Sequence, residues 1–129
     1  MRIYLAHNFA ARNWLRDDVK PLLESHGHEI TSRWLWDDAH LEHDPEHDQR
    51  AAAHDLEDVE AAGALIFFTR QFGDRPGRGK FVELGYAIRA GKIVVLVGSV
   101  DDPGYAGCVF FRLSTIRHAA TIEDALKFL

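Results

Sequence analysis

Residues 78–98 constrain the fold more than any other stretch of the chain, because they join a helical segment to a buried strand. The stretch is RGKFVELGYAIRAGKIVVLVG. Its final apolar run, IVVLVG, is rich in β-branched residues and too short to cross a membrane. Such a run predicts a central strand that is buried on both faces, as in parallel sheets covered by helices.

Glu83 is the acidic residue of this stretch for which a functional role is worth testing. A helix that begins near Gly79 places Glu83 in its first turn, where the helix dipole favours an ionised carboxylate. The glycines at 77, 79 and 85 allow the backbone to approach a ligand closely. A solvated structural carboxylate is the alternative, since acidic residues are common in first turns. A functional role requires a second acid and an orienting polar group from elsewhere.

The rest of the chain alternates predicted strands with predicted helices. Strands are expected at 2–6, 28–36, 64–69, 93–97 and either 109–111 or 115–118, with helices after 8, 44, 78 and 121. This alternation predicts an α/β fold, a flavodoxin-like or Rossmann-like three-layer sandwich whose five-stranded parallel sheet has the order 2-1-3-4-5. A length of 129 residues fits one domain that spans residues 1–129.

Local signals predict where these helices begin, bend and end. Asn8 is a candidate N-cap and Gly27 a candidate C-cap residue for the first helix, in which Pro21 predicts a kink or break. Asp44, followed by proline, predicts the start of the next helix. Thr121 is expected to cap a short final helix over 122–129.

Composition excludes several classes of function. The formal net charge of −5 argues against general nucleic-acid binding, which needs a basic surface. No apolar run has the length of a membrane span and the N-terminus lacks a signal-peptide pattern, so a cytoplasmic location is expected. The single cysteine, Cys108, excludes an internal disulfide and is more typical of a small buried apolar residue than of a catalytic thiol. A small anionic ligand remains possible where Arg75, Arg78 and Lys80 gather.

The predicted sheet brings candidate partners of Glu83 together. Ligands of such sheets bind beyond the carboxyl ends of the strands, where the strand order reverses, so residues 4–12, 70–79 and the start of the Glu83 helix should meet there. Asp55 and Asp58 lie on one side of the preceding helix, where a solvated acidic stripe is the alternative. Tyr4 is equally explained as a core residue of the first strand.

Three segments, taken in order, resemble the nucleoside 2-deoxyribosyltransferase family and its relatives that hydrolyse 2-deoxynucleoside 5-monophosphates. They are IYLAHNF, DLEDVEAAGALI and GKFVELGYAIRAGKIVVLVG. The resemblance implies that Glu83 is the nucleophile, that Asp55 assists departure of the base and that Tyr4 orients Glu83. It also implies a homodimer or larger homo-oligomer acting on a small-molecule nucleoside or nucleotide, with no metal or cofactor.

The implied reaction is cleavage or transfer at an N-glycosidic bond. A carboxylate can stabilise the oxocarbenium-like state or form a glycosyl ester, and a second acid can protonate the base. Water as acceptor makes a hydrolase and a second base makes a transferase. The expected substrate-binding residues are His7, Phe9, Arg12, Gly77, Arg78 and Gly79.

The sequence also departs from the family pattern. Gly63 stands where these proteins commonly have an aspartate, and Gly77 where relatives often have serine or aspartate. The turn after the first strand, AHNFAAR, offers only Arg12 for a phosphate. A non-catalytic nucleotide-binding or sensing module with the same fold is therefore the alternative.

Two other groups of residues are candidate sites. His40, His43, His47 and His54, interspersed with aspartates, are more typical of a mobile, solvated loop than of a metal site. Trp34 and Trp36 should point to opposite faces of the second strand, so that one joins the core and the other is free to stack on a base. A receiver domain and a dinucleotide-binding domain are disfavoured, because the required acidic residues and GxGxxG are missing.

Overall fold

A five-stranded parallel sheet forms the centre of the molecule. The computed structural model describes residues 1–37, 44–75, 77–101 and 104–129. The strands are β1 (Arg2–Ala6), β2 (Glu29–Ile30), β3 (Ala64–Phe68), β4 (Ile93–Val97) and β5 (Ile116–Ala119). They pair in the order β2-β1-β3-β4-β5, which confirms the predicted order and fold class.

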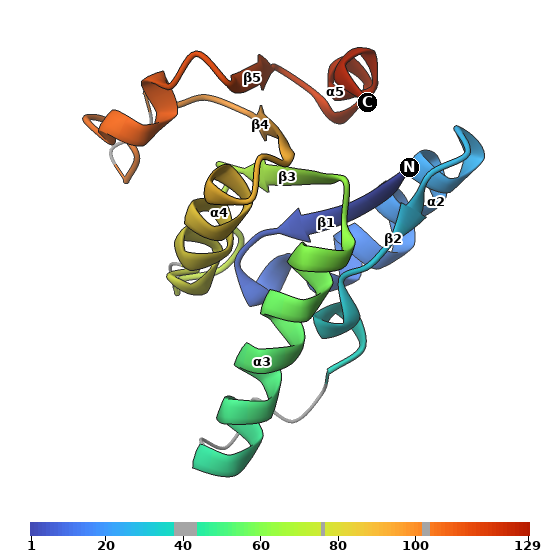
Figure 1. Ribbon diagram of the computed structural model, residues 1–129, viewed down its shortest axis with the longest axis vertical. Coiled ribbons are helices and arrows are strands. Elements are labelled where there is room, and N and C mark those ends of the chain that lie inside the picture. Colours follow the sequence, from blue (N-terminus) through green and yellow to red (C-terminus); the bar gives the residue numbers. More distant parts are fainter. Residues whose placement is uncertain (38–43, 76, 102–103) are drawn as a thin grey trace.

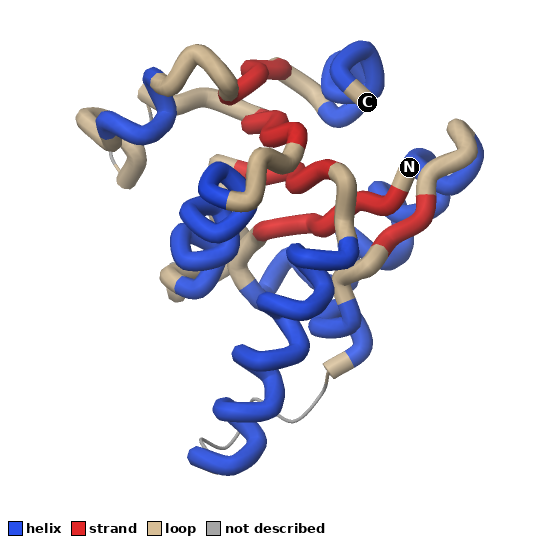
Figure 2. Tube along the Cα trace, in the orientation of Figure 1, coloured by secondary structure: helices blue, strands red, loops and turns tan. Residues whose placement is uncertain are grey.

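Helices cover both faces of this sheet and make three layers (Figures 1 and 2). The long helices α3 (Pro45–Ala61) and α4 (Gly79–Arg89) lie side by side on one face. The shorter α1 (Arg12–Trp14), α2 (Lys20–Ser25) and α5 (Ile122–Ala125) cover the other. Among the described residues, no helix has both the length and the apolar character needed to span a bilayer.

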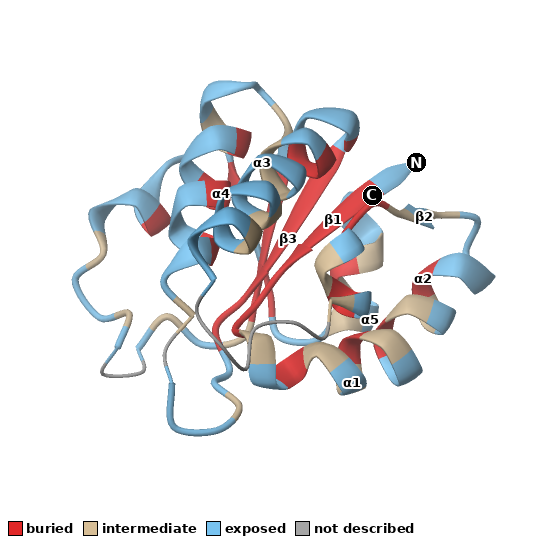
Figure 3. Ribbon diagram, turned by 90° about the horizontal axis from the view of Figure 1, so that it is seen from below, coloured by how far each residue is buried: buried red, intermediate tan, exposed pale blue. Residues whose placement is uncertain are grey.

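The alternation of β1 places Tyr4 on the face that carries the long helices. Ile3 and Leu5 join the core beneath α1 and α2, whereas Tyr4 and Ala6 join the core beneath α3 and α4. β3 is buried along its whole length, and the outer surfaces of the helices are exposed (Figure 3). A tyrosine hydroxyl is thereby held under two helices that carry acidic residues.

The first helical region is irregular, as Pro21 predicts. A 3-10 turn over Phe9–Ala11 leads into α1, a π-helical segment over Leu15–Val19 precedes α2, and Pro21 lies at the start of α2. The π-helical segment lies just before the proline, whose missing N–H and ring disfavour a regular α-helix there. Gly27 has φ 82° just after the helix ends, which confirms it as the terminating residue.

The second strand was predicted too long. Only Glu29–Ile30 pairs with β1, and Arg33–Trp36 forms a 3-10 helix. From Ser32 onward, side chains in place of the backbone make the hydrogen bonds to β1. Ser32 Oγ accepts from the Leu5 N–H at 2.7 Å, and Trp34 Nε1 donates to the Leu5 carbonyl at 3.0 Å. Trp34 and Trp36 therefore do not alternate on a strand, but Trp34 does pack against the core and Trp36 is exposed, as expected.

The other predicted boundaries are largely confirmed. Asp44 caps α3 by accepting from the Glu46 N–H at 3.1 Å, and Thr121 caps α5 by accepting from the Asp124 N–H at 3.1 Å. Of the two positions considered for the last strand, the second is close to β5, because Val109–Arg112 forms a 3-10 helix. The final helix is shorter than predicted and continues as a 3-10 turn over Leu126–Phe128.

Candidate active site

Glu83 and Asp55 line one pocket of about 250 Å³ at the carboxyl end of the sheet. Asp55 comes from α3 and Glu83 from α4, while Tyr4 rises from β1 and interacts with both carboxyls. The pocket has an aromatic, an acidic and a glycine-rich part, with these lining residues: His7, Phe9, Trp34, Asp37, His47, Asp48, Ala51, Asp55, Gly77, Gly79, Lys80 and Glu83. Three predicted residues that are distant in sequence therefore converge.

Glu83 is a buried carboxyl, and its expected position in the first helical turn is wrong. α4 begins at Gly79, so Glu83 is the fifth residue, and the first turn contains no acid. Only 9% of Glu83 is exposed. Burial, and then the charge of Asp55, raise the pKa of Glu83 to about 8, against the opposing effects of Tyr4 and Lys80. Desolvation therefore outweighs any stabilisation of the carboxylate by the helix dipole.

Asp55 is more accessible than Glu83 and has a different environment. Burial, and then the charge of Asp58, raise the pKa of Asp55 to about 6, while Tyr4 lowers it. Asp58 itself is structural: its carboxylate accepts from the Arg33 backbone N–H at 2.8 Å and from Arg33 Nε at 2.7 Å. Of the two acids three residues apart on α3, only Asp55 therefore lines the pocket.

Tyr4 is fully buried between the sheet and the two acids. Burial, and then the charges of Glu83 and Asp55, raise the pKa of its phenol, which stays protonated. Neither the Tyr4 hydroxyl nor Glu83 Oε2 has a hydrogen-bond partner in the described part of the chain. The phenol nevertheless interacts with both carboxyls and lowers the pKa of each.

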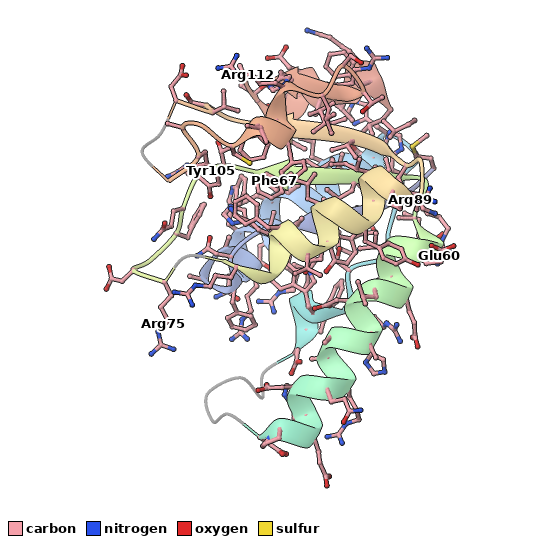
Figure 4. All side chains as sticks on the ribbon, turned by 60° about the vertical axis from the view of Figure 1, so that its left-hand side comes forward. Glu60, Phe67, Arg75, Arg89, Tyr105 and Arg112 are labelled. Atoms are coloured by element: carbon pink, nitrogen blue, oxygen red, sulfur yellow. The ribbon has the colours of Figure 1, made fainter. Side chains whose placement is uncertain are left out.

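Lys80 is a buried cation in the same pocket, and sequence reasoning placed it only in a loose basic cluster. It is 2% exposed, and its Nζ donates to the Phe68 carbonyl at 2.8 Å and to the Tyr105 hydroxyl at 2.5 Å. Its ammonium also lies 4.7 Å from the centroid of the Phe67 ring. Figure 4 shows Tyr105 and Phe67 close together beside α4. Burial lowers the pKa of Lys80 to about 8, and the charge of Glu83 opposes this change.

His7 is held as a neutral imidazole with one nitrogen available. Its Nδ1 accepts from the Asn8 N–H at 2.7 Å, so the ring hydrogen is on Nε2. Nε2 is buried and has no hydrogen-bond partner among the described residues, although the side chain lines the pocket. Burial, followed by the charge of Lys80, lowers the pKa of His7 to about 4. His7 therefore offers a donor to a bound molecule.

The two expected glycine positions approach the site in different ways. A Cβ on Gly77 would lie 2.6 Å from the Asn8 Cα, so this glycine allows the loop after β3 to pack against the loop after β1. Asn8 also links the loop after β1 to the loop after β3. Its side-chain amide donates to the Phe72 carbonyl and accepts from the Phe72 N–H at 3.2 Å. Its side chain makes no helix-capping bond, contrary to expectation. A Cβ on Gly79 would lie 3.9 Å from Glu83 Oε1.

The two arginines expected to bind a phosphate do not line the pocket. Arg12 lies beside it, with its guanidinium 4.4 Å from the Phe9 ring centroid and Nη1 donating to the Asp37 carbonyl at 2.8 Å. Arg78 is exposed at the start of α4 and makes no side-chain capping bond. Phe9, His7, Gly77 and Gly79, the other expected binding residues, all line the pocket.

The histidine-rich segment is more ordered around His47 than expected. His47 lies in α3, lines the pocket, and its Nε2 is 3.0 Å from Asp37 Oδ2. His54 is exposed on the same helix, and His40 and His43 lie outside the described residues. Within the described ranges, no group of three potential ligands is placed to hold a metal ion. The sequence pattern did not reveal His47, Asp37 and Ala51 as lining residues. Asp37 and His47 belong to a polar segment that is typical of a solvated loop, and Ala51 lies in a predicted helix without any signal for a pocket.

Larger hollows lie elsewhere in the described part of the chain. One of about 600 Å³ is lined by residues around Tyr105 and Phe111, and one of about 380 Å³ by residues around Trp14 and Arg70. Neither contains Glu83, Asp55 or Tyr4. The pocket that contains the two candidate catalytic acids is therefore smaller than these hollows.

Comparison with known proteins agrees with this geometry. The family model described as nucleoside 2-deoxyribosyltransferase matches residues 3–121, a range that includes Tyr4, Asp55 and Glu83. The chain belongs to the nucleoside 2-deoxyribosyltransferase family. Membership of the nucleoside 2-deoxyribosyltransferase family indicates an enzyme of the glycosidase or transferase kind that acts on nucleosides or nucleotides.

A solved structure shares the fold of this family member. It is the CMP N-glycosidase BcmB from Clostridium botulinum, which is 20% identical and matches with a TM-score of 0.61. The match covers 98% of this chain and 95% of that one. No curated protein matches the sequence. At this identity the structural likeness supports the architecture, and the activity must be argued from the site.

Proposed function

We propose that this protein cleaves or transfers at the N-glycosidic bond of a 2-deoxynucleoside or its 5-monophosphate, with Glu83 as nucleophile. Asp55 acts as the acid that protonates or orients the departing base, and Tyr4 positions Glu83. The observation that carries the proposal is the convergence of a buried carboxyl, a second carboxyl and a phenol around one pocket. Family membership supports the same reaction class.

The acid pair carries the single proton that this chemistry needs, although in the empty site the higher pKa of Glu83 keeps that proton on Glu83 and not on Asp55. With pKa values of about 6 and about 8, Asp55 and Glu83 together hold one proton near neutral pH. A glycosyl transfer that passes through an oxocarbenium-like state needs one ionised carboxylate at the sugar and one protonated acid at the leaving group. Tyr4 interacts with both carboxyls and is placed to assist redistribution of the proton.

The remainder of the pocket offers matching surfaces. Phe9 and Trp34, with ring centroids 6.2 Å apart, supply an aromatic wall for a base. The unpartnered Nε2–H of His7 supplies a donor for a sugar or phosphate oxygen. The volume of about 250 Å³ is just below the range of about 300–1,000 Å³ typical of small-molecule sites, which fits a compact nucleoside.

A binding or sensing module is the competing function, and one observation favours it. The pKa of about 8 leaves Glu83 largely protonated in the empty site at neutral pH, which is unfavourable for a nucleophile. The glycines at 63 and 77 are further departures from the family pattern. A module that binds the nucleotide without turnover would show tight binding and no release of base.

We also propose that the protein acts as a homodimer or larger homo-oligomer. Exposed apolar side chains gather on α4 and on the 3-10 helix over Val109–Arg112, including Phe81, Val82 and Phe110. A shallow apolar hollow of about 290 Å³ lies between these elements. Light scattering of the wild type and of Phe110→Glu tests this proposal, which requires a multimer that the charged variant weakens.

The enzymatic proposal is tested by incubating the protein with 2-deoxynucleosides and their 5-monophosphates and measuring free base by chromatography. Release of base by the wild type, abolished in Glu83→Gln, supports the proposal. Adding a second free base distinguishes transfer from hydrolysis. Binding without any release, measured by calorimetry, supports the competing module.

A further inference from the structure

One face of α3 runs along the pocket from the acid pair to its far end. His47, Ala51 and Asp55 are spaced by four residues, so they share a face of the helix, and all three line the pocket. At a rise of about 1.5 Å per residue, His47 lies about 12 Å along the axis from Asp55. Ala51 has a small side chain. This face of α3 therefore leaves space beside Ala51, between Asp55 at one end and His47 at the other.

Two aromatic side chains, Phe9 and Trp34, line the same pocket. Trp34 is anchored by the bond from Nε1 to the Leu5 carbonyl, and its ring lies 6.2 Å from that of Phe9. Apolar and aromatic walls with a few fixed polar groups are typical of sites for flat heterocycles. A base whose sugar lies at Glu83 and Asp55 would extend along Ala51 toward His47.

When its ring is neutral, the polar atom that His47 offers at this end is a hydrogen-bond acceptor. Its Nε2 lies 3.0 and 3.2 Å from the two carboxylate oxygens of Asp37, which places the ring hydrogen on Nε2. The other nitrogen, Nδ1, is buried and has no hydrogen-bond partner among the described residues, with Asp48 Oδ1 at 3.7 Å. In the neutral ring Nδ1 carries a lone pair. The nearby groups of Asp37 and Asp48 are carboxylates, which also accept.

We propose that His47, held in orientation by Asp37, accepts a hydrogen bond from an exocyclic amino group of the base. The preferred substrates are then those with an amino-bearing base, such as cytosine or adenine. An oxo group at the same position, as in uracil or hypoxanthine, would face a lone pair and nearby carboxylates. This inference rests on the proposed function, since it assumes that the sugar lies at Glu83.

Matched substrate pairs test the inference. The kcat/KM of the wild type should favour 2-deoxycytidine over 2-deoxyuridine, and 2-deoxyadenosine over 2-deoxyinosine, by about tenfold, as expected when a buried acceptor loses its donor. The same pairs are tested as 5-monophosphates. His47→Ala should bring the ratios close to one, and His47→Phe, which keeps a ring without the acceptor, should do the same. His54→Ala, at an exposed position of the same helix, should leave them unchanged.

The outcomes separate this inference from the proposed function. Base release that depends on Glu83 but shows no amino preference, or a preference that His47→Ala and His47→Phe both retain, overturns the inference and leaves the function standing. If no substrate releases base, the proposed function fails, and calorimetric binding of the same pairs decides the inference. Tighter binding of the amino member, lost in both His47 variants, then supports it, and equal binding overturns it.

Discussion

The negative charge of Asp55 raises the pKa of Glu83, although the two residues belong to different helices and lie 28 positions apart in sequence. Burial is the larger cause, and Tyr4 and Lys80 oppose it. The pair therefore titrates as a unit, with apparent pKa values of about 6 and about 8. This coupling has consequences for both activity and stability.

The pH profile of base release should be bell-shaped, with its maximum between about pH 6 and about pH 8. Below this window both acids are protonated and no carboxylate is available, whereas above it no proton remains for the leaving base. Asp55→Asn should lower kcat by about 10²- to 10⁴-fold and remove the basic limb. The acidic limb that remains should then report the ionisation of Glu83 alone. Its midpoint should lie below pH 8, because the charge of Asp55, which raises the pKa of Glu83, is gone. A bell retained in Asp55→Asn contradicts this assignment.

The free energy of unfolding should fall as pH rises from about 6.5 to 8. A carboxyl whose folded pKa is raised binds more protons when folded, so its contribution is present at low pH and is lost as pH passes the folded value of about 8. The slope for one such group is at most about 1.4 kcal/mol per pH unit. His7 near the lower end of this window and Lys80 near its upper end have the opposite effect, because the folded pKa of each is lowered, so both reduce the slope of the wild type.

Urea unfolding of the wild type and of Glu83→Gln at pH 6.5 and pH 8 measures this slope. The amide cannot titrate, so the variant should be flatter across the window and more stable than the wild type at pH 8. Identical slopes in the two proteins would show that Glu83 has an ordinary carboxyl environment.

Tyr4→Phe should show whether Tyr4 positions Glu83 for the reaction or only stabilises the fold. The Tyr4 hydroxyl is buried without a hydrogen-bond partner among the described residues, so its removal should change the free energy of unfolding by less than about 1 kcal/mol. Activity should fall by about tenfold, because the phenol interacts with both acids. Tyr4 lowers the pKa of each acid, so both limbs of the pH profile should move to higher pH. Unshifted limbs would restrict Tyr4 to a packing role.

Lys80→Met should move the basic limb of the profile upward. The ammonium lowers the pKa of Glu83, and the thioether has similar length but no charge. Tyr105→Phe is the matched control, because it removes the 2.5 Å bond from Lys80 and leaves the charge in place. A limb that moves equally in both variants would attribute the effect to the bond and not to the charge.

Gly77→Ala and Gly79→Ala form a second matched pair. At Gly77 a methyl group would meet the Asn8 backbone at 2.6 Å, so we expect a loss of about 1–3 kcal/mol of stability and reduced base release. At Gly79 the nearest atom is Glu83 Oε1 at 3.9 Å, an ordinary contact, so folding should be unaffected. Thermal unfolding of both variants checks the contrast, which equal Tm values would contradict.

Patterns of local spacing predicted most of the fold. The apolar run at 93–97 predicted a buried strand, which is β4, although the middle strand of the sheet is β3. Helical spacing placed Asp55 and Glu83 on two helices, and the sheet order then brought them to one edge. These features depend on short-range periodicity, which a sequence records directly.

Features that depend on tertiary contacts were not predicted. The Arg33–Trp36 segment alternates like a strand, but Ser32 and Trp34 bond to the Leu5 backbone and end the ladder. Lys80 is buried because Tyr105, 25 residues later, accepts from it. The raised pKa of Glu83 follows from burial, which helix position alone does not reveal.

Trapping a sugar on Glu83 tests the central claim most directly. Wild-type protein is incubated with a 2-deoxynucleoside analogue that carries fluorine at the sugar 2-position, which slows breakdown of a glycosyl ester by destabilising the oxocarbenium-like state. After acid quenching and proteolysis, mass spectrometry should find the added sugar on the peptide that contains Glu83, and none in Glu83→Gln. Base release that persists in Glu83→Gln, with no sugar attached to that peptide in the wild type, would contradict the account.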